Sequence, residues 1–227
     1  YPDFMPVTAL EWSTRLEFTA LAFSRDGSQL AALTGLPEPT LVVWDLRTGA
    51  VLASGPLVVP CNDLSFNPSG DGSLCTLAPK RLLVWKLQLV YKTYLLESKE
   101  IPLDEAADDE AEAANATWTS HCWSPGNALY ASSDVGGVVR LAIGSGGAPT
   151  LVLRCSTGVS ALVADSTHLL VGCADGSVRW YSPSGDEELD EESSLLWSLS
   201  LDSAIKSLVY APDCLKLLAA TDAGETH

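Results

Sequence analysis

Short strand-like runs alternate with turn residues along this chain, and this repetition limits its possible folds more than any other feature. The stretch from Phe18 to Ser54 contains four such runs, separated by turns rich in Gly, Asp, Ser and Pro. Short runs bounded by these residues are typical of small antiparallel sheets. The third run, Leu41–Trp44, is followed at once by Asp45. The sequence therefore predicts an all-β chain made of four-stranded units.

The unit recurs along the chain. One strand-then-turn motif appears five times, with Phe23, Phe66, Trp123, Ala164 and Tyr210 at equivalent positions and spacings of 43, 57, 41 and 46 residues. A four-stranded unit of about forty to forty-five residues with a Trp-Asp pair resembles one blade of a WD40 β-propeller. We therefore expect a WD40-type β-propeller over residues 18–227, incomplete in this chain, with four full blades and part of a fifth.

The two ends of the sequence suggest that more of the propeller lies elsewhere. Val7–Trp12 reads as a lone strand, so residues 1–17 are predicted to be an N-terminal strand or the remnant of an earlier blade. Missing blades would leave sheet edges open. We therefore expect a fragment of a longer chain. Elements supplied by a partner are the alternative.

The formal net charge is −16, and two tracts carry much of it: Asp104–Glu112 and Asp186–Glu192 hold six carboxylates each. An acidic chain lacks the basic footprint that nucleic acid or an anionic membrane surface requires. Both tracts fall in the longest repeat spacings. The sequence therefore predicts acidic loop inserts at 104–116 and 184–194, solvated and flexible, which could meet a basic partner surface.

Candidate catalytic and metal-binding residues are few. His121 and Cys122 are neighbours on a presumed strand, so their side chains point to opposite faces and do not readily share an ion. Asp165, Ser166 and His168 resemble a hydrolytic set, but nothing marks Ser166 as an activated nucleophile. We therefore predict no enzyme activity, no metal and no cofactor.

The cysteines are scattered singly and form no CxxC pair; they are Cys61, Cys75, Cys122, Cys155, Cys173 and Cys214. Most lie inside apolar runs, where free thiols pack as small hydrophobic groups. No run of about twenty apolar residues suggests a membrane span. These features favour a reducing intracellular compartment.

Recurring aromatic residues give the predicted blade positions. Trp44, Trp85 and Trp180 are expected at the end of the third strand of their blades, with Asp45 after the first and Asp175 in a tight turn. In WD-repeat proteins this Trp packs between blades. Because the Gly-His pair that usually opens such a blade is absent, we expect apolar packing to hold these blades together.

A narrower resemblance rests on the order of several elements. Leu36–Pro39 precedes the Trp-Asp pair, Leu64–Pro68 reads LSFNP, Leu82–Leu87 reads LLVWKL, and Ser120–Pro125 reads SHCWSP. This order resembles the cilia- and flagella-associated protein 43 family, the long WD-repeat proteins of the axoneme.

The resemblance implies a non-catalytic scaffold of the cilium or flagellum within the cytoskeleton. Such proteins form a tether that holds an inner-arm dynein motor domain to the doublet microtubule and so regulates motility. The implied partners are a paralogous axonemal WD-repeat protein, the inner-arm dynein heavy chain and doublet microtubule-associated proteins. Nucleic acid and membrane are not expected partners.

Exposed loops are the expected places of contact, because a propeller binds its partners through its rims. The candidate partner-contact residues are Glu38, Asp104, Asp108, Glu187 and Glu191. An alternative function is a cytosolic substrate receptor of a ubiquitin ligase or a generic adaptor, since Trp44–Arg47 matches the Trp-Asp-x-Arg box of such receptors. A propeller enzyme is the least favoured reading.

Overall fold

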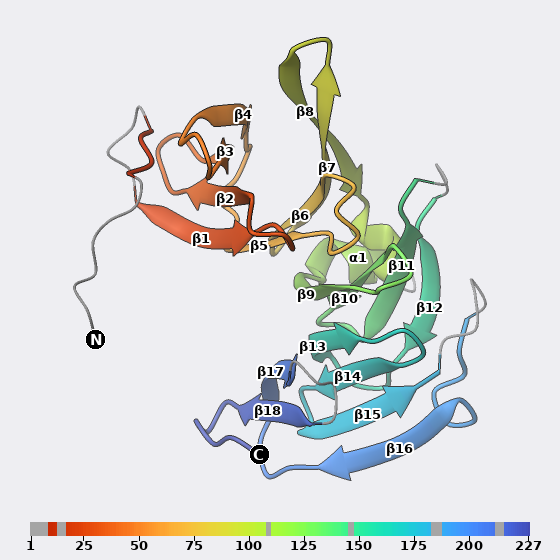
Figure 1. The fold of residues 1–227 in the computed structure, drawn as a ribbon. Coiled ribbons are helices and arrows are strands. Elements are labelled where there is room, and N and C mark those ends of the chain that lie inside the picture. The colour runs from red at the N-terminus through yellow and green to blue at the C-terminus, as the bar shows by residue number, and fades with distance from the viewer. Residues whose placement is uncertain (1–8, 13–16, 108–109, 145–147, 183–187, 212–215) are drawn as a thin grey trace, which may run out of the picture. The chain divides into compact units, whose positions relative to one another are not determined.

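A computed structural model describes the chain apart from residues 1–8, 13–16, 108–109, 145–147, 183–187 and 212–215 (Figure 1). It divides into two compact units, which are described separately. Unit 1 comprises Tyr1–Ala78 and Leu82–Glu100, and unit 2 comprises Pro79–Arg81 and Ile101–His227.

Unit 1 carries two four-stranded antiparallel sheets, in which neighbouring strands follow the order of the chain. We name them blades one and two. Blade one consists of β1 (Phe18–Phe23), β2 (Gln29–Thr34), β3 (Thr40–Asp45) and β4 (Val51–Pro56). Blade two consists of β5 (Asp63–Phe66), β6 (Ser73–Ala78), β7 (Arg81–Val90) and β8 (Thr93–Ile101). The first strands of the two blades, β1 and β5, are in contact.

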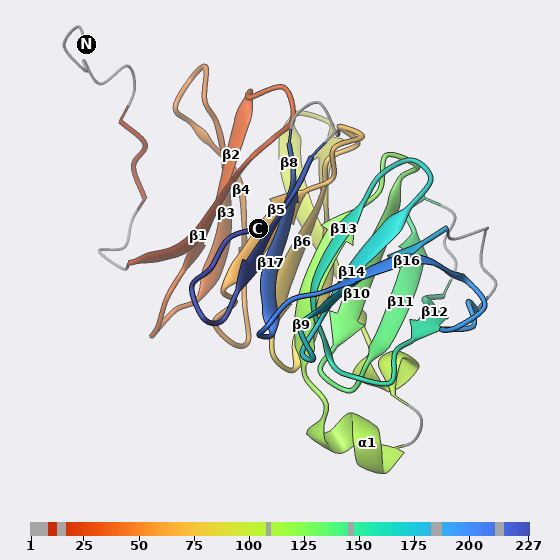
Figure 2. The same ribbon diagram turned by 90° about the horizontal axis from the view of Figure 1, so that it is seen from below.

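Unit 2 repeats this arrangement as blades three to five, and their first strands β9, β13 and β17 lie next to one another (Figure 2). Blade three has β9 (Trp118–Trp123), β10 (Ala128–Ser133), β11 (Gly137–Ala142) and β12 (Thr150–Arg154). Blade four has β13 (Val159–Ala164), β14 (Leu169–Cys173), β15 (Ser177–Tyr181) and β16 (Leu195–Ser200). Blade five shows β17 (Ile205–Tyr210) and β18 (Leu217–Thr221). The expected repeat of four-stranded units is therefore present.

Burial explains why the second strands are nearly all apolar or small. Every residue of β6 and of β10 is buried. A strand that is covered on both faces reads as a continuous rather than an alternating run. The turns that follow use glycine where the backbone must turn left-handed, as at Gly176 with a φ of 85°. Asp175 caps that turn by accepting a hydrogen bond from the Ser177 amide at 2.8 Å.

A side-chain hydroxyl joins neighbouring blades at one repeated position, four residues before the aligned motif residue. Each hydroxyl donates to a backbone carbonyl at or just before the start of the next blade's first strand. A β-bulge interrupts the strand pairing at this position, and bulges redirect a side chain. The donor–acceptor distance is 2.9 Å for the Thr19 hydroxyl and 2.6 Å for the Thr119 hydroxyl. The pairs are Thr19 with Cys61, Thr119 with Val159, and Ser160 with Ile205.

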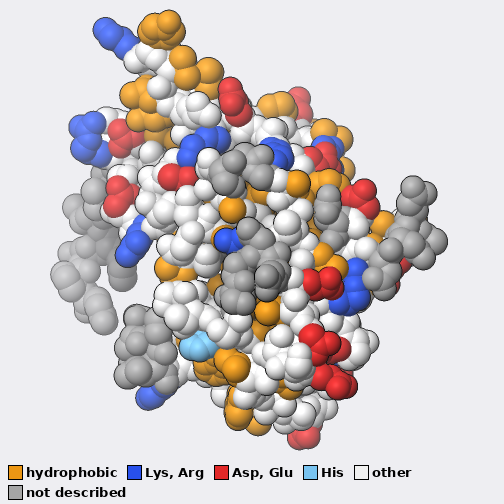
Figure 3. All heavy atoms as spheres, turned by 90° about the vertical axis from the view of Figure 1, so that its right-hand side faces the viewer, with side chains coloured by type: hydrophobic (Ala, Val, Ile, Leu, Met, Phe, Trp, Pro, Cys, Tyr) orange, Lys and Arg blue, Asp and Glu red, His pale blue; other side chains and the backbone are white. Residues whose placement is uncertain are grey.

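Blade two departs from the prediction, because Trp85 does not end its third strand. β7 runs on to Val90 and pairs with β8 as a long hairpin. The turn places Tyr91 at a φ of 56°, and Tyr91 is almost fully exposed with Leu89 beside it on the same hairpin. Apolar side chains are also visible at the top of Figure 3, where Figure 1 places the hairpin end. The alternating residues after Trp85 allow strand pairing to continue.

The first acidic insert differs from the solvated, flexible loop that the sequence predicts. It contains a 3₁₀ helix, η1 (Leu103–Ala106), and a short helix, α1 (Glu110–Asn115), near one end of blade three (Figure 2). Ala106 and Ala116 are fully buried. The Ala106 carbonyl lies where a Cβ on Gly137 would stand, 2.0 Å away. Small residues on both sides permit this approach, and Ala favours helix.

The N-terminal segment also differs from the expected strand. The described part of that stretch, residues 9–12, forms no strand, and residues 7–8 lie outside the described residues. Leu10 and Trp12 instead pack as side chains against a cluster that includes Trp44. None of the helices in the described ranges has the length and apolar character needed to cross a membrane.

Candidate functional site

The register of the strands identifies which third-strand residues are equivalent. In blade one the motif residue Phe23 pairs with Leu30, which pairs with Trp44. In blade four Ala164 pairs with Leu169, which pairs with Tyr181. Tyr181, not Trp180, is therefore the counterpart of Trp44, and the sequence-based assignment of Trp180 was wrong by one residue.

Alternation along the strand gives the two blade-four aromatics different roles. Tyr181 is fully buried in a cluster that includes Val152 and Cys155 at the end of blade three. Trp180 faces the other side, where its ring makes edge contacts with His168 at 5.8 Å and Trp197 at 5.9 Å. Half of Trp197 is exposed. Trp180 thus contributes to a partly open aromatic surface rather than to the buried blade contact.

Trp44 and Trp85 of unit 1 are both buried, and Trp85 lies at the contact between two blades. The ring of Trp85 lies against Gly55 of blade one, where a Cβ would come within 2.7 Å of the ring. Its indole nitrogen donates to the Thr76 hydroxyl at 2.9 Å. Trp44 has no described blade before it. It packs against Trp12 and donates to the Glu11 carbonyl at 3.2 Å.

The two predicted turn aspartates cap their turns. Asp45 accepts a hydrogen bond from the Arg47 amide at 2.8 Å, and this bond lowers the pKa of Asp45. Burial alone would raise the pKa of Asp175, but hydrogen bonds from Ser177 and the charge of Arg179 outweigh it and lower the pKa. The Arg179 guanidinium lies 2.8 Å from the Asp175 carboxylate. Both aspartates thus act on local backbone structure.

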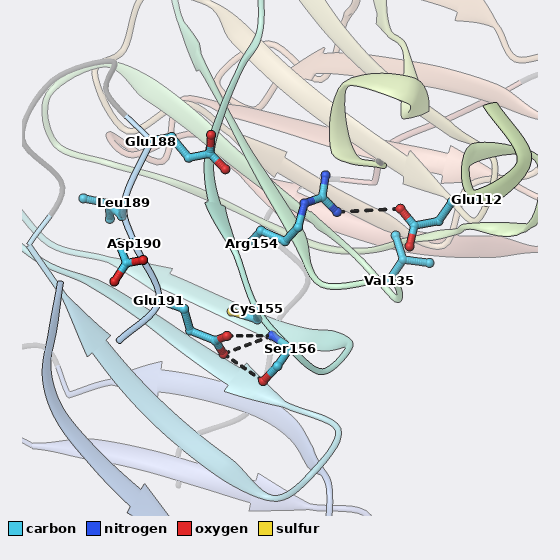
Figure 4. Close-up of a pocket in the computed structure, with 9 residues that line it drawn as sticks. All are labelled: Glu112, Val135, Arg154, Cys155, Ser156, Glu188, Leu189, Asp190 and Glu191. Carbon is cyan, nitrogen blue, oxygen red and sulfur yellow. Dashed lines mark hydrogen bonds and ion pairs between the residues drawn. The ribbon is translucent and has the colours of Figure 1, made fainter. Parts of the chain in front are cut away.

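A cavity of unit 2 lies where residues of the two acidic inserts come together (Figure 4). Its volume is about 720 Å³. Arg154 pairs across it with Glu112 of the first insert at 3.7 Å. The cavity is lined by Glu112, Val135, Arg154, Cys155, Ser156, Glu188, Leu189, Asp190 and Glu191. The carboxylates outnumber the single arginine, so the cavity favours a cationic group.

The second insert is anchored on blade three. Leu189 is buried, forms a parallel bridge with Leu153, and its amide donates to the Val152 carbonyl at 2.6 Å. Glu191 accepts hydrogen bonds from the Ser156 amide and hydroxyl at 3.0 Å and forms an ion pair with Arg179. This segment covers part of the β12 edge, which limits strand addition there. The predicted solvated loop is therefore packed in its described part.

The candidate contact residues consequently fall into three groups. Glu38 and Asp104 are exposed. Glu191 is held inside unit 2 by the interactions above. Asp108 and Glu187 lie outside the described residues. Leu189 is the sequence signal that could have marked Glu191. One apolar residue in an acidic run indicates a buried anchor, and Glu191 lies close to Leu189 in the same tract.

The hydrolase-like residues form a capped turn. Asp165 accepts from the amides of Thr167 and His168, both at 2.7 Å, and from the Tyr210 hydroxyl at 3.2 Å. Burial would raise the pKa of Asp165, but these backbone and side-chain hydrogen bonds from Thr167 and His168 lower it to about 2. Ser166 is exposed. The carboxylate is thus used to hold the turn.

Metal coordination finds no support in the part of the chain that the structure describes, where no group of three or more His, Cys, Asp and Glu side chains could hold an ion. His121 is buried in β9, whereas the neighbouring Cys122 is half-buried and packs against the core cluster of blades three and four. Burial raises the pKa of the Cys122 thiol.

Sequence comparisons point to one kind of protein. No family model matches the chain. Cilia- and flagella-associated protein 43 of Xenopus laevis is 27% identical over 143 residues, covering 61% of this chain and 9% of the relative. The Chlamydomonas reinhardtii protein of that name is 32% identical over 139 residues, covering 57% and 8%. The mouse protein is 27% identical over 110 residues, covering 47% and 6%. The chain thus spans less than a tenth of each relative.

A solved structure supports the fold. The β-propeller domain of Myceliophteria thermophila Cps50 (Swd1) superposes with a TM-score of 0.69 over 95% of this chain and 69% of its own, at 15% identity. At that identity the likeness establishes fold alone. Together with the repeated four-stranded sheets, these findings identify the chain as an incomplete WD40-type β-propeller that resembles cilia- and flagella-associated protein 43.

Proposed function

We propose that this chain is the propeller part of a non-catalytic axonemal scaffold in cilia or flagella. The observation that best supports this proposal is the resemblance to cilia- and flagella-associated protein 43 of three organisms. The scaffold belongs to a tether complex that holds an inner-arm dynein motor domain to the doublet microtubule and so regulates motility. Its partners are a paralogous WD-repeat protein, the dynein heavy chain and doublet microtubule-associated proteins.

The packing of Leu10 and Trp12 supports the assignment of residues 1–17 to an earlier blade. Trp12 and Leu10 cover Trp44 as blade one covers Trp85. Residues 1–17 are accordingly the remnant of an earlier blade, and residues 18–227 are a propeller segment with inserts at 104–116 and 184–194.

Partner binding is proposed to use the exposed carboxylates of the rim loops. Glu38 and Asp104 are exposed, Asp108 belongs to the first acidic tract, and Glu187 belongs to the second. Rim charges of one sign steer a partner of opposite charge and mainly change the association rate. Glu191 is excluded as a contact because Arg179 and Ser156 already bind it.

The experiment is to express the tagged full-length protein in motile ciliated cells and to fractionate their axonemes. We expect the protein to remain with detergent-extracted axonemes and to copurify with inner-arm dynein after salt release. A soluble cytosolic protein that lacks dynein would contradict the proposal. Copurification with a ubiquitin-ligase adaptor, lost on Arg47→Ala, would support the receptor alternative, since the Arg47 side chain is 82% exposed.

A charge variant tests the contact residues. Asp104→Asn, Asp108→Asn and Glu187→Gln together should weaken recovery of the partner and reduce its salt dependence. The matched control is Asp202→Asn with Glu97→Gln, two exposed carboxylates outside both inserts. Equal partner recovery and equal salt dependence in the two variants would show that the inserts are not part of the interface.

A further inference from the structure

Cys155 and Cys173 are separated in the sequence but pack in one buried cluster of unit 2. Cys155 follows β12 at the end of blade three, and Cys173 ends β14. Both belong to one buried cluster with Tyr181. The two thiols lie in the same cluster closely enough for each to shift the pKa of the other, and neither is in a disulfide. The pair is therefore a preformed dithiol rather than two isolated apolar side chains.

The polar groups around this pair favour one thiolate. Hydrogen bonds from Cys155 and Ser177 and the charge of Arg179 outweigh burial and lower the pKa of Cys173 to about 7. The same contact, together with burial, raises the pKa of Cys155. Arg179 is held in place by Asp175 and Glu191 on either side. A thiolate beside a fixed guanidinium is the nucleophilic form of cysteine.

The cavity reaches one member of the pair, Cys155. Cys155 lines the acidic cavity of about 720 Å³ and is 3% exposed, while Cys173 lies fully buried behind it. A small uncharged oxidant can enter a cavity of this size. Cys122 of the same unit differs, because it is half-buried and desolvation raises the pKa of its thiol.

We propose that Cys155 and Cys173 form an oxidisable modification site, at which a peroxide converts the thiol pair into a reversible disulfide. The Cys173 thiolate attacks one peroxide oxygen, breaking the O–O bond and releasing hydroxide, and becomes a sulfenic acid. The Cys155 sulfur then attacks the Cys173 sulfur, loses its proton and expels water. Two thiols and one hydrogen peroxide thus give one disulfide and two waters. This inference does not depend on the proposed ciliary function.

The site would affect the second acidic insert through its neighbour in the chain. Ser156 follows Cys155 directly, and its amide holds both Glu191 carboxylate oxygens at 3.0 Å. A disulfide would draw the Cys155 sulfur toward Cys173 and so disturb the neighbouring Ser156, whose amide holds Glu191. Oxidation is therefore expected to increase amide exchange in residues 188–192.

The experiment treats the purified protein with hydrogen peroxide, blocks remaining thiols with N-ethylmaleimide and maps the peptides by mass spectrometry. We expect a Cys155–Cys173 linked peptide that has lost two hydrogens and that dithiothreitol reverses. Its rate of formation should rise with pH and level off above about pH 7, following the lowered pKa of Cys173. Both cysteines recovered as maleimide adducts, or linked to other cysteines, would overturn the proposal.

Single substitutions separate the two roles. In Cys155→Ser we expect a Cys173 sulfenic acid that dimedone traps, whereas in Cys173→Ser we expect Cys155 to stay a thiol. Cys122→Ser is the matched control, because it removes a half-buried cysteine of the same unit and should leave the linked peptide intact. Dimedone on Cys155 in the Cys173→Ser protein would overturn the assigned order of attack. The wild-type mapping above remains decisive if a variant does not fold.

Discussion

Blade two and blade four place a large aromatic side chain at the same point of the third strand, but surround it with different chemistry. Trp85 is buried against Gly55, and its nitrogen donates to the Thr76 hydroxyl. Tyr181 is buried beside Cys155, in the neighbourhood of Arg179. The repeat thus determines where the aromatic lies, whereas the neighbouring residues decide whether the position is inert or reactive.

The largest expected effect concerns the inert position. Trp85→Ala should lower the free energy of unfolding of unit 1 by about 3–5 kcal/mol, because it leaves a cavity between two blades. Hydrogen exchange of the β6 and β7 amides measures this loss. Trp197→Ala, at a half-exposed ring, is the control and should cost much less. Equal losses would show that Trp85 does not hold the blades together.

A paired substitution sharpens the assignment of Tyr181. Tyr181→Ala should destabilise unit 2 by about 3 kcal/mol or more, because a fully buried ring is lost. Trp180→Ala should cost less, since that ring lies on the partly open face beside Trp197. Thermal and urea unfolding of the two variants provide the comparison. A larger loss for Trp180→Ala would restore the assignment made from the sequence.

The hydrogen bond of blade two gives a smaller effect. Thr76→Val keeps the shape of the side chain but leaves the Trp85 nitrogen without its hydroxyl acceptor. We expect a loss of about 1–3 kcal/mol, the usual cost of an unsatisfied buried polar group. Exchange protection of β7 is the measurement. Thr93→Val, on an exposed position of β8, should change it little.

The smallest expected effect tests the hydroxyl links between blades. Ser160→Ala removes the bond to the Ile205 carbonyl and should cost about 1 kcal/mol. The loss should appear as faster exchange in β17, the strand that the bond reaches. Ser198→Ala on exposed β16 is the matched control. Unchanged exchange in β17 would mean that apolar packing alone joins these two blades.

Much of the fold was predictable because local residues encode it. Apolar runs separated by Asp, Gly and Asn turns gave the strands, and the motif spacing gave the repeated unit. The long β7–β8 hairpin and the helices of the first insert were missed. Continued strand pairing after Trp85 and the burial of Ala106 depend on surrounding elements rather than on a nearby turn residue.

The candidate site was predictable only in part. The acidic tracts were visible in the composition, but their partners were not. Glu191 binds Ser156, which lies 35 residues away in the chain. Leu189 forms a bridge with Leu153 of β12 across a similar separation in the sequence. Such contacts follow from the return of the chain to an earlier blade, which no local pattern records.

The sequence by itself determined that this protein is a series of antiparallel four-stranded sheets, because alternating apolar residues and turn residues act over a few positions. The tertiary structure decided that Tyr181 rather than Trp180 is the buried aromatic, since strand register depends on pairing along the whole sheet. It also brought Cys155 and Cys173 together, since packing one blade against the next places the end of one strand beside another.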